Sequence, residues 1–368
     1  MPVGMVLMEW DDRIGASVLM KYPQDTELSK KTLMQIYGTH EYNRDVGIIS
    51  LTIGQNSITS YYSGPEYNIY IILVLLLEEE PDAYEESLMD ISSVIIQNKK
   101  ESDNLKKLMP QLFHRVAVYP TFDEKRKLMF IYSDKLKRIL LERLRSEGSL
   151  FKSEISVWFQ EEYETLFVDI ENVIDRFTKM GIIKQASVKG LSGEILFMNH
   201  DLLLYRVPPA DLLRNSSSRG LPSKLTKYYS SKVREYFKAY IPNKEDNIAL
   251  INLLLEPDVY ETVKLLRTAA VTLDDFEKLK KKGVYDIDSV LKRLDENNLL
   301  IVLQKNETNY YCLKSDYSVV RYFPQFLVNV IRKDSNNKAK SKKVLLEHLK
   351  ILKETYQLEK KKKKKKKV

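Results

Sequence analysis

Residues that could carry out chemistry are few and widely spaced in this sequence. No glycine-rich phosphate loop is present, since Gly54 and Gly64 each stand alone at a turn. Cys312 is the only cysteine, which excludes an internal disulfide and a cysteine-based zinc site. The histidines never fall at the HxxxH or HExxH spacing of metal motifs; they are His40, His114, His200 and His348. The sequence therefore predicts a protein that is not an enzyme and that uses no cofactor or metal.

One acidic cluster deserves separate weighing as a cation site. Glu78-Glu79-Glu80 is followed closely by Glu85-Glu86, and clustered carboxylates are the ligands of hard divalent cations. The same residues also suit a solvated loop and the first turn of a helix, where acidic side chains interact favourably with the helix dipole. We favour this second interpretation, so no metal-ligating residue is assigned.

Clustered lysines are the only residues that we assign to binding, in this case to a polyanion. The net charge of +8 is uneven, because residues 1–110 carry 9 basic and 17 acidic residues, whereas residues 332–368 carry 16 basic and 4 acidic residues. Such a basic segment attracts nucleic acid or an anionic membrane surface. The candidate residues are Lys278, Lys280, Lys281, Lys282, Lys360, Lys361, Lys362, Lys363, Lys364, Lys365, Lys366 and Lys367.

The location that the sequence suggests is the cytoplasm. A single cysteine suits a reducing compartment. Residues 1–12 lack the basic and apolar regions of a signal peptide. The longest apolar run, residues 69–77, would rise only about 13 Å as a helix, against about 30 Å of bilayer hydrocarbon. We therefore expect no transmembrane segment, and we interpret this run as a buried central strand.

Short strands and helices joined by turns are expected in the first hundred residues. The apolar runs at residues 5–10 and 14–22 flank Asp11-Asp12-Arg13, which suits a hairpin turn. Residues 28–38 have helical spacing, and three further strand-like runs follow at residues 47–53, 57–63 and 68–77. Tyr84, Leu88, Ile91 and Ile95 then form a helical stripe, and residues 105–119 form a further helix or connector.

This ββαβββα order resembles the longin and profilin-like family of small α/β domains over roughly residues 3–110. The resemblance rests on element order and on no diagnostic motif. It implies a domain that acts without catalysis in membrane trafficking or as the partner of a small GTPase.

The pattern changes after residue 120 to helices followed by strand pairs. Residues 134–146, 151–160 and 164–180 have helical spacing, and Gly181 ends the third helix. Two apolar runs at residues 182–188 and 194–206 then suit a two-stranded wing. Three helices and a wing resemble the winged-helix pattern, a variant of helix-turn-helix.

A second copy of this pattern follows at a fixed distance. Residues 258–268, 272–281 and 286–296 have helical spacing, and residues 299–303 and 309–313 suit a short wing. Residues 173–177 align with residues 290–294, and residues 181–183 align with residues 298–300, at one ungapped offset of 117 positions. Gly181 thereby matches Asn298, and these two residue types best tolerate the left-handed conformation that ends a helix.

The predicted fold class is a multi-domain α+β chain with a basic, disordered tail. The segments are a longin-like domain (1–110), winged-helix domain 1 (125–207), a linker with a connecting helix (208–245), winged-helix domain 2 (246–333) and the tail (334–368). Residues 211–223 are expected to be flexible, and residues 315–334 are expected to form a terminal helix interrupted near Pro324. The layout resembles uncharacterised archaeal proteins that place a longin-like domain before winged helices.

Charge favours protein docking over DNA binding by the winged helices. A recognition helix needs cationic side chains near phosphates, yet residues 164–180 and residues 286–296 each carry four acidic and two basic residues. The leading hypothesis is an intracellular adaptor whose longin-like domain binds a protein partner, possibly in trafficking or with a small GTPase, through a sheet edge or helix face. The alternative is a DNA-binding transcriptional regulator. A hydrolase is disfavoured by the missing nucleophile and base.

Overall fold

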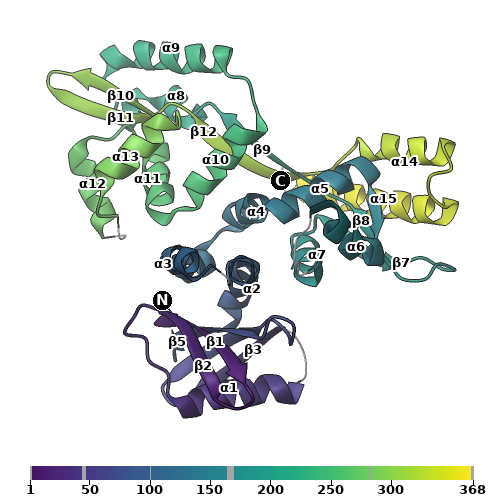
Figure 1. Cartoon of the computed structure of the whole chain (residues 1–368). Coiled ribbons are helices and arrows are strands. Elements are labelled where there is room, and N and C mark those ends of the chain that lie inside the picture. Colours follow the sequence, from purple (N-terminus) through teal and green to yellow (C-terminus); the bar gives the residue numbers. More distant parts are fainter. Residues whose placement is uncertain (1, 44–46, 100, 164–169, 282–283, 366–368) are drawn as a thin grey trace. The chain divides into compact units, whose positions relative to one another are not determined.

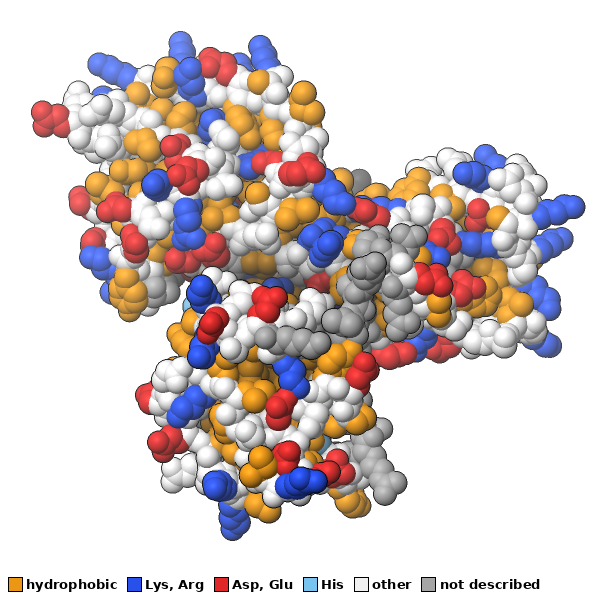
Figure 2. Space-filling view, in the orientation of Figure 1, with side chains coloured by type: hydrophobic (Ala, Val, Ile, Leu, Met, Phe, Trp, Pro, Cys, Tyr) orange, Lys and Arg blue, Asp and Glu red, His pale blue; other side chains and the backbone are white. Residues whose placement is uncertain are grey.

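The computed structural model describes the backbone of residues 2–43, 47–99, 101–163, 170–281 and 284–365. The fold is α+β and divides into two compact units. Unit 1 comprises residues 1–122 and 153–175, and unit 2 comprises residues 123–152 and 176–368. Side chains of both charges are interspersed over the surface that Figure 2 shows.

Unit 1 is built around a five-stranded antiparallel sheet with the strand order β2-β1-β5-β4-β3 (Figure 1). Its strands are β1 (Gly4–Asp11), β2 (Gly15–Tyr22), β3 (Gly47–Ile53), β4 (Asn56–Tyr62) and β5 (Ile69–Leu76). Its helices are α1 (Lys30–Asn43), α2 (Asp82–Gln97) and α3 (Ser102–Val118), followed by the 3-10 turn η1 (Tyr119–Thr121). Helix α6 (Lys152–Tyr163), apart from its first residue, and the first part of α7 (Ile170–Lys179) also belong to this unit.

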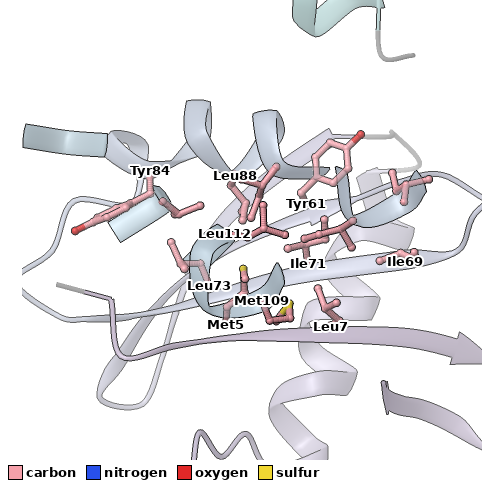
Figure 3. Packing of buried hydrophobic residues seen from close by; sticks show 14 of the residues in the cluster. Met5, Leu7, Tyr61, Ile69, Ile71, Leu73, Tyr84, Leu88, Met109 and Leu112 are labelled. Atoms are coloured by element: carbon pink, nitrogen blue, oxygen red, sulfur yellow. The ribbon is translucent and has the colours of Figure 1, made fainter. Parts of the chain in front are cut away.

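The two central strands, β1 and β5, are buried on both faces. On one face Met5 and Leu7 pack with residues of α2 and α3, which lie over the sheet in Figure 3. On the other face Val6 and Met8 pack with Leu33 and Ile36 of α1. Burial on both faces explains why these strands are continuous apolar runs instead of alternating ones. The prediction that residues 69–77 form a buried central strand is confirmed.

Helix α2 rests on the sheet through the stripe that its sequence predicts. Tyr84, Leu88, Ile91 and Ile95 are at most 4% exposed and belong to one cluster with the sheet residues (Figure 3). The stripe works because residues three or four positions apart lie on the same side of a helix.

Unit 2 contains two successive series of elements. The first series is α4 (Glu124–Ser133), α5 (Lys135–Glu147), β6 (Ser149–Phe151), β7 (Ile183–Ser187), β8 (Glu194–Met198), β9 (Asp201–Val207), α8 (Ala210–Asn215), η2 (Ser217–Arg219) and α9 (Ser223–Ala239), with α6 and α7 between β6 and β7 in sequence. The second is α10 (Lys244–Leu255), α11 (Pro257–Thr268), α12 (Leu273–Lys280), α13 (Ile287–Glu296), β10 (Leu300–Lys305), β11 (Thr308–Leu313), β12 (Asp316–Tyr322), α14 (Leu327–Asn336) and α15 (Lys342–Lys365). We call these series the first and second copies.

Equivalent residues of the two copies make equivalent contacts where the helix before each hairpin ends. Gly181 and Asn298 both adopt left-handed backbone conformations, with φ of 64° and 56°. The carbonyl of Gly181 bonds to His200 Nδ1 at 2.8 Å, and the carbonyl of Asn298 accepts from Ser315 Oγ at 2.7 Å. His200 and Ser315 each precede the last strand of their copy. The predicted match of Gly181 with Asn298 therefore extends to their conformation and to their bonding.

A second pair of equivalent contacts ties a helix to the last strand of each copy. In the first copy Arg145 of α5 donates to Asp201, the first residue of β9. In the second copy Arg267 of α11 donates to Asp316, the first residue of β12. Asp201 and Asp316 also accept the backbone N–H of the residue that follows them. Each carboxylate therefore fixes the start of its strand.

The last helix of each copy covers the hairpin of the same copy. His348 of α15 bonds through Nε2 to the Met198 carbonyl at 2.9 Å, and Tyr229 of α9 donates to the Leu313 carbonyl at 2.7 Å. Met198 and Leu313 each end the second strand of their hairpin. The duplication thus runs from α4 to α9 and from α10 to α15, well beyond the aligned residues 173–183 and 290–300.

A local two-fold axis relates the paired strands of the two copies. Strands β9 and β12 are antiparallel, and Leu204 lies opposite Val319. These two residues are equivalent, because Leu204 is three positions after Asp201 and Val319 is three positions after Asp316. Helices α4 and α10, which are also equivalent, pack against each other beside these strands. The copies therefore meet as the subunits of an isologous dimer do.

Crossed ion pairs extend this symmetry. Arg206 of β9 binds both carboxylate oxygens of Asp246 in α10, each at 2.7 Å. Arg321 of β12 lies 3.6 Å from the Glu124 carboxylate in α4. Each arginine reaches the first turn of a helix in the opposite copy, where an acidic residue also suits the helix dipole.

Two predictions about the end of each copy are wrong. Residues 194–206 are not one wing strand, because the chain turns at residues 199–200 and β9 leaves the hairpin to pair with β12. Residues 315–334 are not an interrupted helix, because residues 316–322 form β12 and α14 begins only at Leu327. Buried Tyr317 and Val319 alternate with less buried residues, a period of two, and the partner strand lies more than a hundred positions away.

The expected flexible linker and disordered tail are also corrected. Residues 211–223 contain α8 and η2, which are held by buried Leu212 and Leu221 in a cluster with Tyr229 and Val233. The tail is helical from Lys342 to Lys365, because Val344 and Ile351 pack against the β7–β8 hairpin. The lysine run masked an apolar stripe that precedes it; Lys366 and Lys367 lie outside the described residues.

Candidate protein-docking site

The residues with chemical potential in unit 1 are enclosed in its core. His40 bonds through Nε2 to Ser60 Oγ at 3.1 Å, which superficially suits a nucleophile and its base. However, Ser60 is 0% exposed and His40 is 2% exposed, so a substrate cannot approach them. Burial also lowers the pKa of His40 to about 4. This pair therefore serves packing between α1 and β4.

Histidine and cysteine are structural in unit 2 as well. Burial lowers the pKa of His348 to about 4, and its ring is bonded to a backbone carbonyl. His200 is bonded to the Gly181 carbonyl and to Glu359, and burial is the main cause of its lowered pKa. Cys312 is 0% exposed, and burial raises its pKa to about 12. None of these groups faces a site.

No cluster of three metal-ligating side chains occurs among the described residues. In the cluster at residues 78–80, Glu79 accepts a hydrogen bond from Tyr84, while Glu78 and Glu80 lie beside the start of α2. Within the same described part of the chain, no helix is long and apolar enough to cross a membrane.

The predicted polyanion-binding lysines fall on two different elements. On α12, Lys278 pairs with Asp275 at 2.8 Å and Lys280 pairs with Glu277 at 2.7 Å. Lys281 is exposed at the end of this helix, and Lys282 lies outside the described residues. Residues 360–365 continue α15, which packs on the hairpin of the first copy. The lysines of α12 therefore offer little free positive charge.

The helices before the hairpins are poorly suited to a nucleic acid. In α7, Arg176 is only 3% exposed. In α13, Arg293 forms ion pairs with Glu256 and Asp258 of the preceding helix segment. The exposed side chains of α13 include Asp288, Asp295 and Glu296 against Lys292. The arginines that the sequence offered to phosphates are thus engaged elsewhere or buried.

The most distinctive exposed apolar surface of unit 1 lies on the edge strand β2. Strand β2 pairs only with β1, so its other edge presents unpaired backbone N–H and C=O groups. Val18 is 46% exposed and Leu19 is 43% exposed, and Ile14 in the adjoining hairpin turn is 82% exposed. We call these three residues the β2 edge patch.

Local structure holds the β2 edge patch outward. The pairing register shifts between Leu7 and Met8, so that Leu19 is the extra residue of a β-bulge. In the turn, the Asp11 carboxylate accepts the backbone N–H groups of Arg13 and Ile14 at 2.8 and 3.0 Å. These bonds fix the turn, and the bulge explains why two consecutive apolar side chains are exposed.

The opposite edge of the sheet differs in character. Strand β3 exposes the polar residues Ser50 and Thr52, and Ser50 donates to Glu85 of α2 at 3.5 Å. Polar side chains on an edge discourage pairing with another chain, whereas exposed apolar ones favour it. The β2 edge is therefore the better docking edge.

Sequence reasoning anticipated a sheet edge but assigned no residue to it. The signal was the consecutive run Val18-Leu19-Met20, which breaks the alternation expected of a half-buried strand. Such a break indicates a bulge.

Comparison with protein-family models finds no match for this chain, and comparison with curated proteins also finds none. Function must therefore be argued from the residues themselves.

Proposed function

We propose that the chain is a non-enzymatic cytoplasmic adaptor that binds a protein partner at the β2 edge of unit 1. The observation that carries the proposal is the β2 edge patch, an unpaired strand edge with three exposed apolar side chains. A partner that adds a strand there would pair the free backbone groups and cover the apolar side chains, the mode known as β-augmentation.

The element order of unit 1 supports a longin-like domain. The order ββαβββα is followed by a further helix, with α1 on one face of the sheet and α2 and α3 on the other. A small GTPase or a trafficking component is the partner class that this resemblance implies.

The duplicated elements of unit 2 support two winged-helix domains that act as protein-docking modules. The acidic exposed surface of α13 and the burial of Arg176 both oppose binding to a polyanion. Fold alone does not decide between protein and DNA, so charge carries this part of the proposal.

The proposal is tested by selecting phage-displayed random peptides on the immobilised full-length chain. We expect extended apolar peptides whose affinity falls at least about tenfold in the Val18→Lys, Leu19→Lys variant, because charges on an edge oppose strand addition. The matched control is Ser50→Lys, Thr52→Lys on the β3 edge, which should retain full affinity.

Two outcomes would overturn the proposal. One is peptide binding that survives the β2 substitutions but is lost in the β3 control. The other is selection of one duplex DNA sequence by the same chain, with an affinity unchanged when residues 362–368 are removed; this result would instead establish the transcriptional regulator.

A further inference from the structure

Helix α15 has two faces with different partners. Its inner face is buried, with Val344, Leu345, Ile351 and Leu352 each at most 5% exposed. Val344 and Ile351 pack with Val188, Ile195 and Phe197 of the hairpin. His200 and Lys184 bond to Glu359 and Glu354 on the flanks of the helix. The helix is therefore held in one orientation on the body, which fixes what its outer face presents.

The outer face of α15 carries exposed apolar side chains. Leu346 is 55% exposed, Leu349 is 39% exposed and Tyr356 is 53% exposed. Their spacing of three and then seven positions places them along one side of the helix. Exposed leucines at this spacing are not needed for folding, because the buried stripe on the opposite side already packs on the hairpin.

Lysines flank these apolar residues. Lys342, Lys353, Lys360 and Lys361 are exposed, and within the described part of the chain no acidic side chain pairs with them. The acidic residues of the helix are engaged, because Glu347 pairs with Lys350, Glu354 with Lys184, and Glu359 with His200. The outer face therefore has an uncompensated positive charge, and the sequence adds Lys362–Lys365 to the same helix.

Basic side chains also gather on neighbouring elements. Arg332 and Lys333 of α14 and Lys338 in the following turn are exposed. Figure 2 shows Lys and Arg side chains clustered at the end of unit 2 where α14 and α15 lie. The positive region is thus broader than one helix.

We propose that the outer face of α15 binds an anionic lipid bilayer surface, with the helix lying in the plane of the membrane. Lysines attract anionic headgroups, and leucine and tyrosine side chains enter the boundary between headgroups and acyl chains. A nucleic acid would use the lysines but would leave the leucines in water, so the apolar stripe favours a membrane. This binding goes beyond the protein-docking role and is independent of the β2 edge.

The test is flotation of the full-length chain with phosphatidylcholine vesicles that contain or lack phosphatidylserine. We expect binding only to the anionic vesicles, and we expect it to weaken as salt is raised. The Leu346→Ser, Leu349→Ser variant should bind at least about tenfold more weakly, since it loses insertion but keeps every charge. The Lys342→Glu, Lys353→Glu variant should lose binding.

The duplication supplies a matched control, because α9 is the equivalent helix of the first copy. Lys227 and Tyr228 are exposed on α9, so the Lys227→Glu, Tyr228→Ser variant should bind vesicles like the unaltered chain. Circular dichroism checks that all variants fold.

Three results would overturn the proposal. The first is equal binding to neutral and anionic vesicles. The second is vesicle binding that the leucine substitutions leave unchanged, which would assign the attraction to lysines alone. The third is duplex DNA binding that is tighter than vesicle binding and is lost with the same lysines. The Val18→Lys, Leu19→Lys variant should float normally, so failure here is distinguishable from failure of the adaptor proposal.

Discussion

Buried histidines show how single residues in this chain serve structure. His40 and His348 are each enclosed and bonded, and both have a pKa lowered to about 4 by burial, from an ordinary value of 6.5. Their isolation in sequence predicted structural roles, and their bonds agree. What the sequence could not show is their partners, because Ser60 and Met198 lie far away along the chain.

Their lowered pKa values predict acid sensitivity. An unfolded histidine takes up a proton near pH 6.5, whereas the folded ones resist until about pH 4. The stabilisation is complete above pH 6.5 and is lost as pH falls toward 4, at about 1.4 kcal/mol per pH unit for each histidine. Urea unfolding followed by circular dichroism between these pH values should show a shallower dependence in His348→Gln. His114→Gln, at an exposed position, should match the unaltered chain, and equal slopes in all three proteins would contradict the argument.

At the scale of elements, local pattern predicted most of unit 1 correctly. Each strand and helix there has a period and turn residues that agree with its structure, as in β5 and α2. The failures lie where pairing is remote. Strand β12 finds its partner β9 more than a hundred positions away, and α15 is stabilised by a hairpin formed much earlier in the chain. Composition also misled, because the terminal lysines concealed the apolar stripe before them. The β2 edge patch was missed because exposure depends on the register of pairing.

The docking of α15 predicts that its removal destabilises unit 2. A chain ending at residue 341 loses Val344, Leu345, Ile351 and Leu352 and exposes Phe197, which should cost roughly 5 kcal/mol or more of unfolding free energy. A chain ending at residue 361 keeps the buried stripe and loses only lysines and Val368, so its stability should change by about 0.5 kcal/mol or less. Thermal unfolding compares the two, and equal melting temperatures would refute the packing role of the helix.

At the scale of the molecule, duplication explains the architecture of unit 2. The sequence shows only a short aligned core of the repeat, because the flanking helices have diverged in residue type while their contacts persist. His348 and Tyr229 are unlike residues that bond to equivalent carbonyls. The two-fold relation could not be predicted, since it depends on strand pairing between copies. Its consequence is an interface that resembles that of a homodimer but lies within one chain.

The crossed ion pairs allow this interface to be tested. Arg206 has a side chain 1% exposed and binds Asp246 through two nitrogens, whereas Arg321 faces a Glu124 side chain that is 69% exposed. Arg206→Met leaves a half-buried carboxylate without its main partner, which should cost about 3 kcal/mol or more. Arg321→Met should cost about 1 kcal/mol or less, because exposed pairs are weak. Urea unfolding of the full-length chain measures both changes.

The double variant Arg206→Met, Asp246→Leu separates an ion pair from a general packing requirement. Replacing both partners of a buried pair with apolar residues is often close to neutral, whereas removing one partner is not. We therefore expect the double variant to recover most of the stability lost in Arg206→Met. If it is instead as unstable as the single variant, the arginine stabilises the interface through its other contacts, such as its bond to Ser315 at 2.9 Å, and the ion pair is not what joins the two copies.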